Sequence, residues 1–154
     1  MNRHFTIYCA HAISGKSQDE VLDYYVGIRK DLSEMGYKVL HPMTGKGILR
    51  TDIKFKADVG NENPICTNHS IKERDQWMVR TADVVLTDLS NTEIVSIGCV
   101  AELAMADVLG KHTVVVIPKD NIHRHAFILE MADIVFETLD EAKEYLRKLI
   151  GQEV

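Results

Sequence analysis

The chain has 154 residues, of which 45% are hydrophobic and 27% are charged, and its formal net charge at pH 7 is −5. A chain of this length can bury about 70% of its unfolded surface in one core, so we expect residues 1–154 to form a single domain. The charged clusters are mixed in sign and no apolar run reaches the roughly 18 residues of a spanning helix. These features exclude nucleic acid and membrane as expected partners and leave a small molecule.

Cysteine and histidine usage indicates the compartment and argues against a metal. The three cysteines lack the spacing of a disulfide framework: Cys9, Cys66 and Cys99. The N-terminus lacks the long apolar core of a signal peptide, so we expect a cytoplasmic protein. Two pairs could suggest metal ligands, Cys66 with His69 and His123 with His125, but neither supplies three ligands at a recognised spacing. We predict no metal and no cofactor.

Strand and helix patterns alternate along the chain. In chain order, the patterns predict a strand over 5–10, a helix over 18–35, a strand over 37–41, a helix over 70–81, a strand over 83–88, a helix over 98–109, strands over 112–117 and 133–136, and a helix over 139–150. Several strands are apolar at consecutive positions, which is typical of a parallel sheet covered on both faces. Gly36 and Gly110 stand where helix C-terminal caps are expected. The pattern predicts a doubly wound α/β fold, flavodoxin- or Rossmann-like, with five parallel strands flanked by helices.

Ligands of such folds bind beyond the carboxyl ends of the strands. The loops expected there follow the first four strands, and one connection, residues 42–69, is long and lacks clear periodicity. We interpret that connection as a lid, a substrate loop or an insertion. The first loop contains Ser14, Gly15 and Lys16 just before a helix, so its backbone N–H groups and Lys16 could meet an anion. It lacks the full P-loop spacing, and a plain strand-to-helix turn is the alternative.

Two carboxylates are candidates for chemistry. Glu102 lies in the otherwise apolar segment 96–106, where a helix is expected to start against the sheet. A glutamate there would face the ligand crevice near the positive end of the helix dipole, although a solvated helical glutamate is the alternative. Asp75 could act as a general acid at the same crevice, or it could be a surface acid paired with Arg74 or Lys72.

The motifs together resemble a known family, the nucleoside 2-deoxyribosyltransferases. The resemblance rests on I-Y-C-A-H-A-I-S-G at the N-terminus, on R-D-Q-W-M-V-R-T-A-D-V-V-L-T-D-L, and on S-I-G-C-V-A-E-L-A-M-A-D-V-L-G-K after it. It covers most of the chain except the 44–68 loop. It implies that Glu102 of the G-x-x-x-E segment is a nucleophile that attacks the anomeric carbon. It also implies that Asp75 helps to deliver a proton to the base and that Tyr8 of the first strand orients the nucleophile.

One departure from the family pattern bears on the substrate. Transferases that act on free nucleosides carry an aspartate six residues before the nucleophile, where this chain has Ser96. An aspartate would repel a phosphate, whereas a hydroxyl can donate to one. Serine here is similar to the branch that hydrolyses nucleoside 5′-monophosphates. The resemblance implies further substrate contacts at Ser14, Gly15, Lys16, Asp88 and Gly98, and a phosphate contact at His125 from a neighbouring subunit.

The sequence therefore predicts an enzyme that hydrolyses the N-glycosidic bond of a nucleoside or deoxynucleoside 5′-monophosphate through Glu102. We expect a homo-oligomer, at least a dimer, with a shared active site. One alternative is base exchange between deoxyribonucleosides by a 2-deoxyribosyltransferase. Another, from a different class, is a nucleotide-binding sensor without catalysis. The identity of the base and the choice between ribose and deoxyribose stay open.

Overall fold

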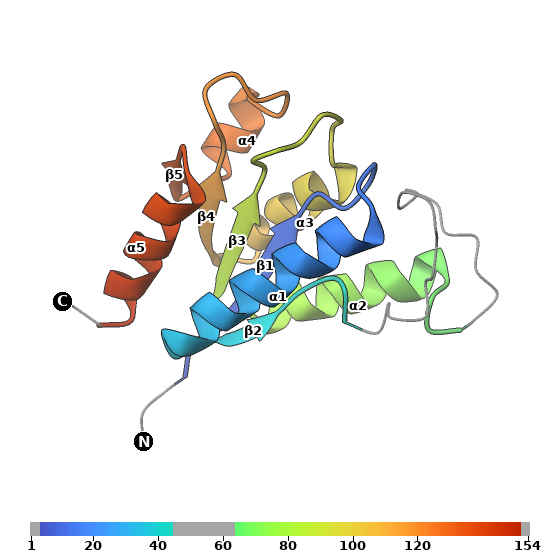
Figure 1. Cartoon of the computed structure of the whole chain (residues 1–154), viewed down its shortest axis with the longest axis horizontal. Helices are drawn as coiled ribbons and strands as arrows, with labels where there is room; N and C mark the ends of the chain where they lie inside the picture. Colours follow the sequence, from blue (N-terminus) through green and yellow to red (C-terminus); the bar gives the residue numbers. More distant parts are fainter. Residues whose placement is uncertain (1–3, 45–63, 152–154) are drawn as a thin grey trace.

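The computed structural model describes residues 4–44 and 64–151, and within them it contains five strands and five helices (Figure 1). In chain order these are β1 (Thr6–His11), α1 (Gln18–Glu34), β2 (Lys38–Leu40), α2 (Asn68–Thr81), β3 (Val84–Asp88), α3 (Ile97–Val108), β4 (His112–Val116), α4 (Ala126–Glu130), β5 (Ile134–Phe136) and α5 (Leu139–Leu149). Each strand and helix predicted from the sequence is present, and no end is shifted by more than two residues.

The five strands form one parallel sheet in the order β2-β1-β3-β4-β5. Its two central pairs align Cys9 with Leu86 and Leu86 with Val114. The consecutive apolar residues of β1, β3 and β4 are buried because helices cover both faces of the sheet. The predicted doubly wound α/β fold is therefore confirmed.

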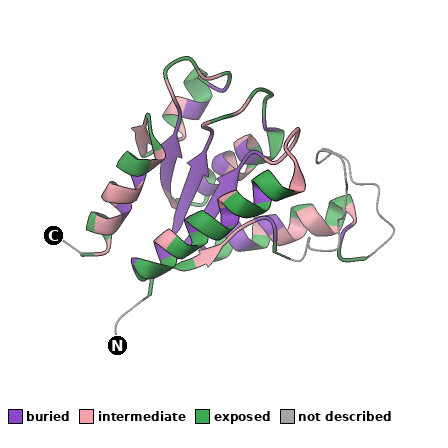
Figure 2. Ribbon diagram, viewed as in Figure 1, coloured by how far each residue is buried: buried purple, intermediate pink, exposed green. Residues whose placement is uncertain are grey.

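Alternate residues of each strand supply two separate cores. Ile7, Cys9, Leu86 and Val114 pack with residues of α1 and α5 on one face of the sheet. On the other face, a core of α2, α3 and α4 residues packs against strand residues that include Tyr8, Ala10, Val85 and Val115. Figure 2 shows buried residues along the sheet and exposed residues on the outer sides of the helices. The helix that carries Asp75 and the helix that carries Glu102 thus lie on the same face as the Tyr8 side chain.

The structure adds detail that the periodicity does not give. Helix α2 begins at Asn68, two residues before its predicted start, because the Thr67 hydroxyl accepts from the Ser70 N–H at 3.1 Å and caps the helix. Helix α4 is only five residues long, too short for a helical period to be recognised in the sequence. Gly36 and Gly110 adopt φ of 104° and 65°, as expected after helix ends. Most of the long connection 42–69, interpreted as a lid, a substrate loop or an insertion, lies outside the described residues, which omit 45–63.

Within the described ranges, every helix is too short or too polar to span a bilayer.

Candidate active site

The candidate site lies at the carboxyl edge of the sheet, beside the adjacent strands β1 and β3. The chain leaves β1 toward α1 on one face of the sheet and leaves β3 toward α3 on the other. A sheet of order 2-1-3-4-5 has its topological switch point between these two strands, where loops diverge and leave a crevice. Two pockets lie in this region. Residues of α2 and α3 line the first, and residues of the loops after β1 and β3 line most of the second.

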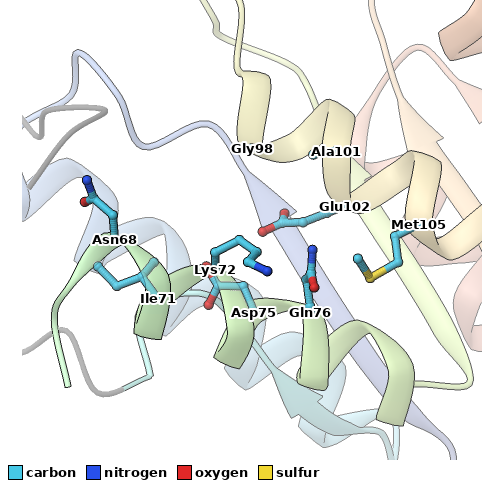
Figure 3. Close-up of a pocket in the computed structure, with 9 residues that line it drawn as sticks. All are labelled: Asn68, Ile71, Lys72, Asp75, Gln76, Gly98, Ala101, Glu102 and Met105. Atoms are coloured by element: carbon cyan, nitrogen blue, oxygen red, sulfur yellow. The ribbon is translucent and has the colours of Figure 1, made fainter. Parts of the chain in front are cut away.

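The first pocket, of about 250 Å³, lies between α2 and α3 (Figure 3). Its lining residues are Asn68, Ile71, Lys72, Asp75, Gln76, Gly98, Ala101, Glu102 and Met105. In Figure 3 the Glu102 carboxylate extends from α3 toward α2, and Asp75 comes from the facing helix. Asp75 is buried, at 7% exposure, and Glu102 is half-buried. The sequence-predicted Asp75, Gly98 and Glu102 are therefore brought together in one pocket.

A buried phenol holds the glutamate. The Tyr8 hydroxyl of β1 donates to Glu102 Oε1 at 2.9 Å, across 94 residues of sequence. Tyr8 is completely buried, and burial raises its pKa well above the usual value, with the Glu102 and Asp75 carboxylates adding to the rise. The phenol therefore stays protonated and remains a donor to Glu102. This contact orients one carboxylate oxygen and lets the glutamate sit in a largely apolar helix.

The second pocket, of about 440 Å³, lies between the loop after β1 and the loop after β3. Its lining residues are Ala12, Ser14, Gly15, Lys16, Glu20, Asn91, Thr92, Glu93 and Ile94. Gly15 has φ of 81°, and a Cβ at this position would lie 3.3 Å from Ile94 Cδ1. The backbone conformation thus favours glycine, and a Cβ here would also displace the end of the Ile94 side chain on the second loop by a few tenths of an ångström. The predicted anion loop does line a pocket.

A lysine joins the two loops of this second pocket. Lys16 Nζ donates to the Asn91 backbone carbonyl at 2.8 Å, and Asn91 itself has a positive φ of 53°. Glu20 also lines the pocket, where its carboxylate accepts from the Ser17 N–H at 2.7 Å as part of the capping box of α1. Lys16 therefore supplies positive charge, while Glu20 and Glu93 supply negative charge to the same pocket.

Asp88, predicted to contact substrate, is at 1% exposure and is engaged by protein donors. One carboxylate oxygen accepts from the Tyr24 hydroxyl at 2.8 Å, and the other accepts from the Ser90 N–H at 2.9 Å and from the Ser90 hydroxyl. The Tyr24 ring stacks on His11, whose pKa is lowered by burial against the opposing effect of Asp88. In the described structure Asp88 shapes the start of the loop after β3, and a direct contact with substrate stays a prediction.

Ser96 is the N-cap of α3. Its hydroxyl accepts from the Cys99 N–H at 3.4 Å, and its exposure is only 9%. It stands between Ile94, which lines the second pocket, and Gly98, which lines the first. Because its hydroxyl accepts the capping bond, its proton is available for donation to another acceptor. Capping and a contact to a substrate oxygen are therefore compatible.

The two histidines of the H-x-H segment differ in environment. His125 is exposed and caps the short α4, its Nδ1 accepting from the Phe127 N–H at 3.2 Å. His123 is buried, at 3% exposure, and its Nε2 accepts from the Ser96 N–H at 2.7 Å. The family resemblance names His125 as a phosphate contact and gives no role to His123. The local sequence pattern does not distinguish the two histidines, because His123 is buried by a contact with Ser96, 27 residues away in sequence.

No group of three or more metal-ligating side chains is found among residues 4–44 and 64–151.

Comparison with known proteins identifies the fold. No family model matches the chain, and no curated protein matches it significantly. Solved structures do match. A 2-deoxyribosyltransferase from Bacillus psychrosaccharolyticus has 17% identity and a TM-score of 0.66, with 91% of each chain covered. A 2-deoxyribosyltransferase from Leishmania mexicana has 20% identity and a TM-score of 0.63, covering 94% of this chain and 97% of its own.

A CMP N-glycosidase from Clostridium botulinum is also similar, with 13% identity and a TM-score of 0.56, covering 94% of this chain and 96% of its own. The chain therefore has the 2-deoxyribosyltransferase fold over almost its whole length. This is the fold that the resemblance in sequence predicts.

The close approach at Gly15 gives a test of the second pocket. Gly15→Ala should lower the free energy of unfolding by about 1–2 kcal/mol, because alanine is strained at a φ of 81° and would press on Ile94. Gly27→Ala is the matched control: it lies in α1 where a Cβ meets nothing, so it should stabilise by about 0.5–1 kcal/mol. Urea unfolding of both variants checks the pair, and equal effects would contradict the described loop geometry.

Proposed function

We propose that this protein cleaves the N-glycosidic bond of a nucleoside 5′-monophosphate and releases the free base and a sugar 5-phosphate. The observation that carries the proposal is the pocket between α2 and α3, which Asp75 lines from one helix and Glu102 from the other, with Glu102 held by the Tyr8 hydroxyl. Two carboxylates from different elements are the usual equipment for cleaving a glycosidic bond. The fold shared with 2-deoxyribosyltransferases and with a CMP N-glycosidase supports the same class of chemistry.

Each carboxylate has a distinct task in the proposed reaction. A Glu102 oxygen attacks the anomeric carbon as the bond to the base breaks, so the electron pair of that bond leaves with the base nitrogen. Asp75 in its acid form gives that nitrogen a proton. Water then cleaves the resulting glycosyl ester: it gives a proton to the Asp75 carboxylate as its oxygen adds to the anomeric carbon, and the Glu102 carboxylate and the acid form of Asp75 are both restored. The transition states carry positive charge on the sugar, which the Glu102 carboxylate stabilises.

Tyr8 supports this chemistry by keeping the nucleophile in place. Its hydroxyl is fixed by a fully buried strand position, so the carboxylate is oriented before substrate arrives. Such preorganisation reduces the reorganisation needed at the transition state. Because the phenol proton is retained, Tyr8 acts as a donor to Glu102 and not as a base.

The 5′-monophosphate assignment rests on the second pocket and on Ser96. Ser14, Gly15 and Lys16 offer a hydroxyl, loop amides and a positive charge at the N-terminal side of α1. Ser96 offers a hydroxyl at the start of α3 without a negative charge. Glu20 is held at the α1 cap, which turns its carboxylate toward the helix N-terminus. These features favour a phosphate at the 5′ position.

Base exchange between free deoxyribonucleosides is the second candidate. Glu93 and Glu20 give the second pocket two carboxylates against the single positive charge of Lys16. An acidic pocket favours a neutral 5′-hydroxyl over a phosphate dianion. The two candidates share Glu102 and Asp75 and differ in the 5′ group and in the acceptor, water or a second base.

A panel assay separates the candidates. The protein is incubated with ribo- and deoxyribonucleosides and with their 5′-monophosphates, each with and without a second free base, and the products are separated by chromatography. Free base from monophosphates alone supports the proposal. A new nucleoside formed from the added base supports exchange. Binding without release of base from any substrate would instead indicate a nucleotide sensor.

Glu102→Gln should abolish cleavage while leaving the fold intact. Glutamine keeps an acceptor for the Tyr8 hydroxyl but cannot form the glycosyl ester, so the loss should be on the order of 4 kcal/mol or more in activation free energy. The kcat of purified protein is measured beside thermal unfolding. Glu34→Gln, at an exposed position of α1, is the control and should leave both unchanged. Near-normal turnover in Glu102→Gln would remove Glu102 from the mechanism.

Asp75→Asn should slow cleavage most for bases that are poor leaving groups, because such bases need the proton that Asp75 delivers. The measurement is kcat/KM across a series of bases of increasing basicity. The slope against leaving-group pKa should become steeper in the variant. If all bases slow by one common factor, Asp75 positions the substrate and does not protonate it.

Ser96→Asp should reverse the preference between a 5′-monophosphate and the free nucleoside. Aspartate caps helices as well as serine, so the fold should be kept. It would repel a phosphate and accept from a 5′-hydroxyl, and charged hydrogen bonds of about 1.5–3 kcal/mol imply a shift in the ratio of specificities of at least roughly tenfold. The ratio of kcat/KM for the two substrates is compared in both proteins. An unchanged ratio would leave Ser96 as a helix cap only.

The proposed active site is shared between subunits of a homo-oligomer, at least a dimer. Three large side chains on the outer surfaces of α3 and α4 are exposed: Ile97 at 79%, Val108 at 85% and Phe127 at 73%. His125 lies next to Phe127 in sequence and is exposed as well. We take these exposed apolar side chains of α3 and α4 to belong to an interface with a second copy. A second copy packed there would bring His125 of one subunit toward the site of the other.

Light scattering at micromolar concentration should find a species at least twice the 17.4 kDa of the chain. Phe127→Glu should shift the protein toward monomer, because a charge would be buried in the interface. A wild-type protein found only at 17.4 kDa would contradict the proposal.

A further inference from the structure

Side-chain hydrogen bonds centred on His123 join two loops at the carboxyl edge of the sheet. These are the β3–α3 loop, residues 89–96, and the β4–α4 loop, residues 117–125. His123 Nε2 accepts from the Ser96 N–H at 2.7 Å, and the His123 backbone N–H donates to Asn121 Oδ1 at 2.9 Å. Asn121 Nδ2 in turn donates to the Leu89 carbonyl at 2.6 Å. The two loops are thus tied at both ends of the β3–α3 loop.

The chain of donors and acceptors permits one tautomer of the imidazole. The Leu89 carbonyl is only an acceptor, so the Asn121 group beside it must be the amide NH₂, and Oδ1 must face His123. His123 Nδ1 lies 3.1 Å from that oxygen and must therefore carry the proton. Nε2 then has a lone pair, which is what the Ser96 N–H requires. If Nε2 were protonated, its N–H would point at the Ser96 N–H, and two donors would face each other without an acceptor.

The tie acts on the residue from which α3 begins. Three atoms of Ser96 are engaged: its N–H donates to His123, its hydroxyl accepts from the Cys99 N–H, and its carbonyl accepts from the Val100 N–H at 3.1 Å. Glu102 lies six residues further along the same helix, a distance of about 9 Å at 1.5 Å per residue. Because a helix is stiff over this length, the position of Ser96 sets where the Glu102 carboxylate lies.

The groups that face the imidazole are neutral. They are the Ser96 N–H, the Asn121 side chain and the Thr92 hydroxyl, whose oxygen lies 3.3 Å from Nδ1. The charged or titratable residues of the two loops are exposed: Glu93, Lys119, Asp120, Arg124 and His125. Burial lowers the pKa of His123 below its ordinary value of about 6.5. The neutral ring that the hydrogen bonds require is therefore also the form that burial favours.

We propose that His123 is a positioning residue whose neutral ring, protonated at Nδ1, holds the Ser96 N–H and so fixes the start of α3 for the chemistry of Glu102. The tautomer and the connection between the two loops are inferred from the hydrogen bonds alone. The consequence for catalysis rests on the proposed function. Protonation at low pH would release Ser96, loosen the loop and misplace the nucleophile.

The first experiment tests the tie without any assay of activity. Long-range ¹H–¹⁵N NMR of the histidine rings should show His123 as the Nδ1–H tautomer at about pH 7.5. As the pH is lowered, the amide signal of Ser96 should shift with the same midpoint as the His123 ring, and that midpoint should lie below about 6.5. An Nε2–H tautomer, or a Ser96 amide that ignores the ring titration, would overturn the proposal even if the protein cleaves no nucleotide.

The second experiment compares two substitutions by their pH profiles. His123→Gln keeps an acceptor for the Ser96 N–H and does not titrate, so its kcat/KM at about pH 7.5 should stay within about threefold of wild type. His123→Leu removes the acceptor and should lose on the order of a hundredfold, the usual effect of a displaced catalytic group. Part of the fall in wild-type kcat/KM below about pH 6.5 should be absent in His123→Gln.

Stability gives an independent readout of the same titration. The His123 pKa is lower in the folded than in the unfolded protein, so the unfolded protein binds more protons as the pH falls below about 6.5. The free energy of unfolding should therefore fall over that range, and His123→Gln should fall less than wild type. His11 also has a lowered pKa, so it too lowers the free energy of unfolding as the pH falls, in wild type and in His123→Gln alike.

His112→Gln is the matched control, because His112 begins β4 at the opposite edge of the sheet, where it contacts Asp133 and Tyr145. It should keep the wild-type pH profile of kcat/KM. Equal activity losses in His123→Gln and His123→Leu would show that the ring serves only to fill space and would overturn the proposal. So would a fully active His123→Leu. If His123→Leu does not fold, the glutamine variant and the NMR titration still decide the question.

Discussion

The pairing of β1 with β3 is the constraint on which the site depends. These strands run parallel, with Tyr8 opposite Val85 and His11 opposite Asp88, although 77 residues separate the partners. Because the chain leaves β1 for one face of the sheet and β3 for the other, the loops after them diverge at this point and both pockets form beside it. Without this pair, the segments that carry Ser14 to Lys16 and Ser96 to Glu102 would have no common edge.

The same pairing explains how a glutamate is tolerated in an apolar helix. Tyr8 points from β1 into the core shared with α2 and α3, and its hydroxyl meets the Glu102 carboxylate at 2.9 Å. A buried polar group is stable only with a partner, so the strand and the helix each satisfy the other. The Glu102 carboxylate in the apolar segment 96–106 is therefore stabilised by the Tyr8 phenol of a distant strand. The contact also fixes the orientation that nucleophilic chemistry would need.

The loops around the site are joined by a few long-range polar contacts. Lys16 reaches the Asn91 carbonyl, Tyr24 reaches Asp88, and His123 reaches the Ser96 N–H. Each joins segments far apart in sequence, and two of the three end on a backbone group. Backbone groups in loops lack the partners that helices and strands provide, so side chains must satisfy them. These side chains therefore join the loops at the carboxyl edge of the sheet to one another.

The sequence by itself determined the order of strands and helices and the parallel sheet. It also singled out Asp75 and Glu102, which line one pocket, and, through the family resemblance of its motifs, Tyr8, which donates to Glu102. Local patterns carry this information, since apolar runs, helical periods and glycine caps act over a few residues. The tertiary structure decided the rest: that α4 exists, that Asp88 is enclosed by Tyr24 and Ser90, and that His123 and not His125 is buried against Ser96. These outcomes depend on which loops the sheet brings together, and contacts across 27 to 94 residues leave no mark on the local pattern of a single chain.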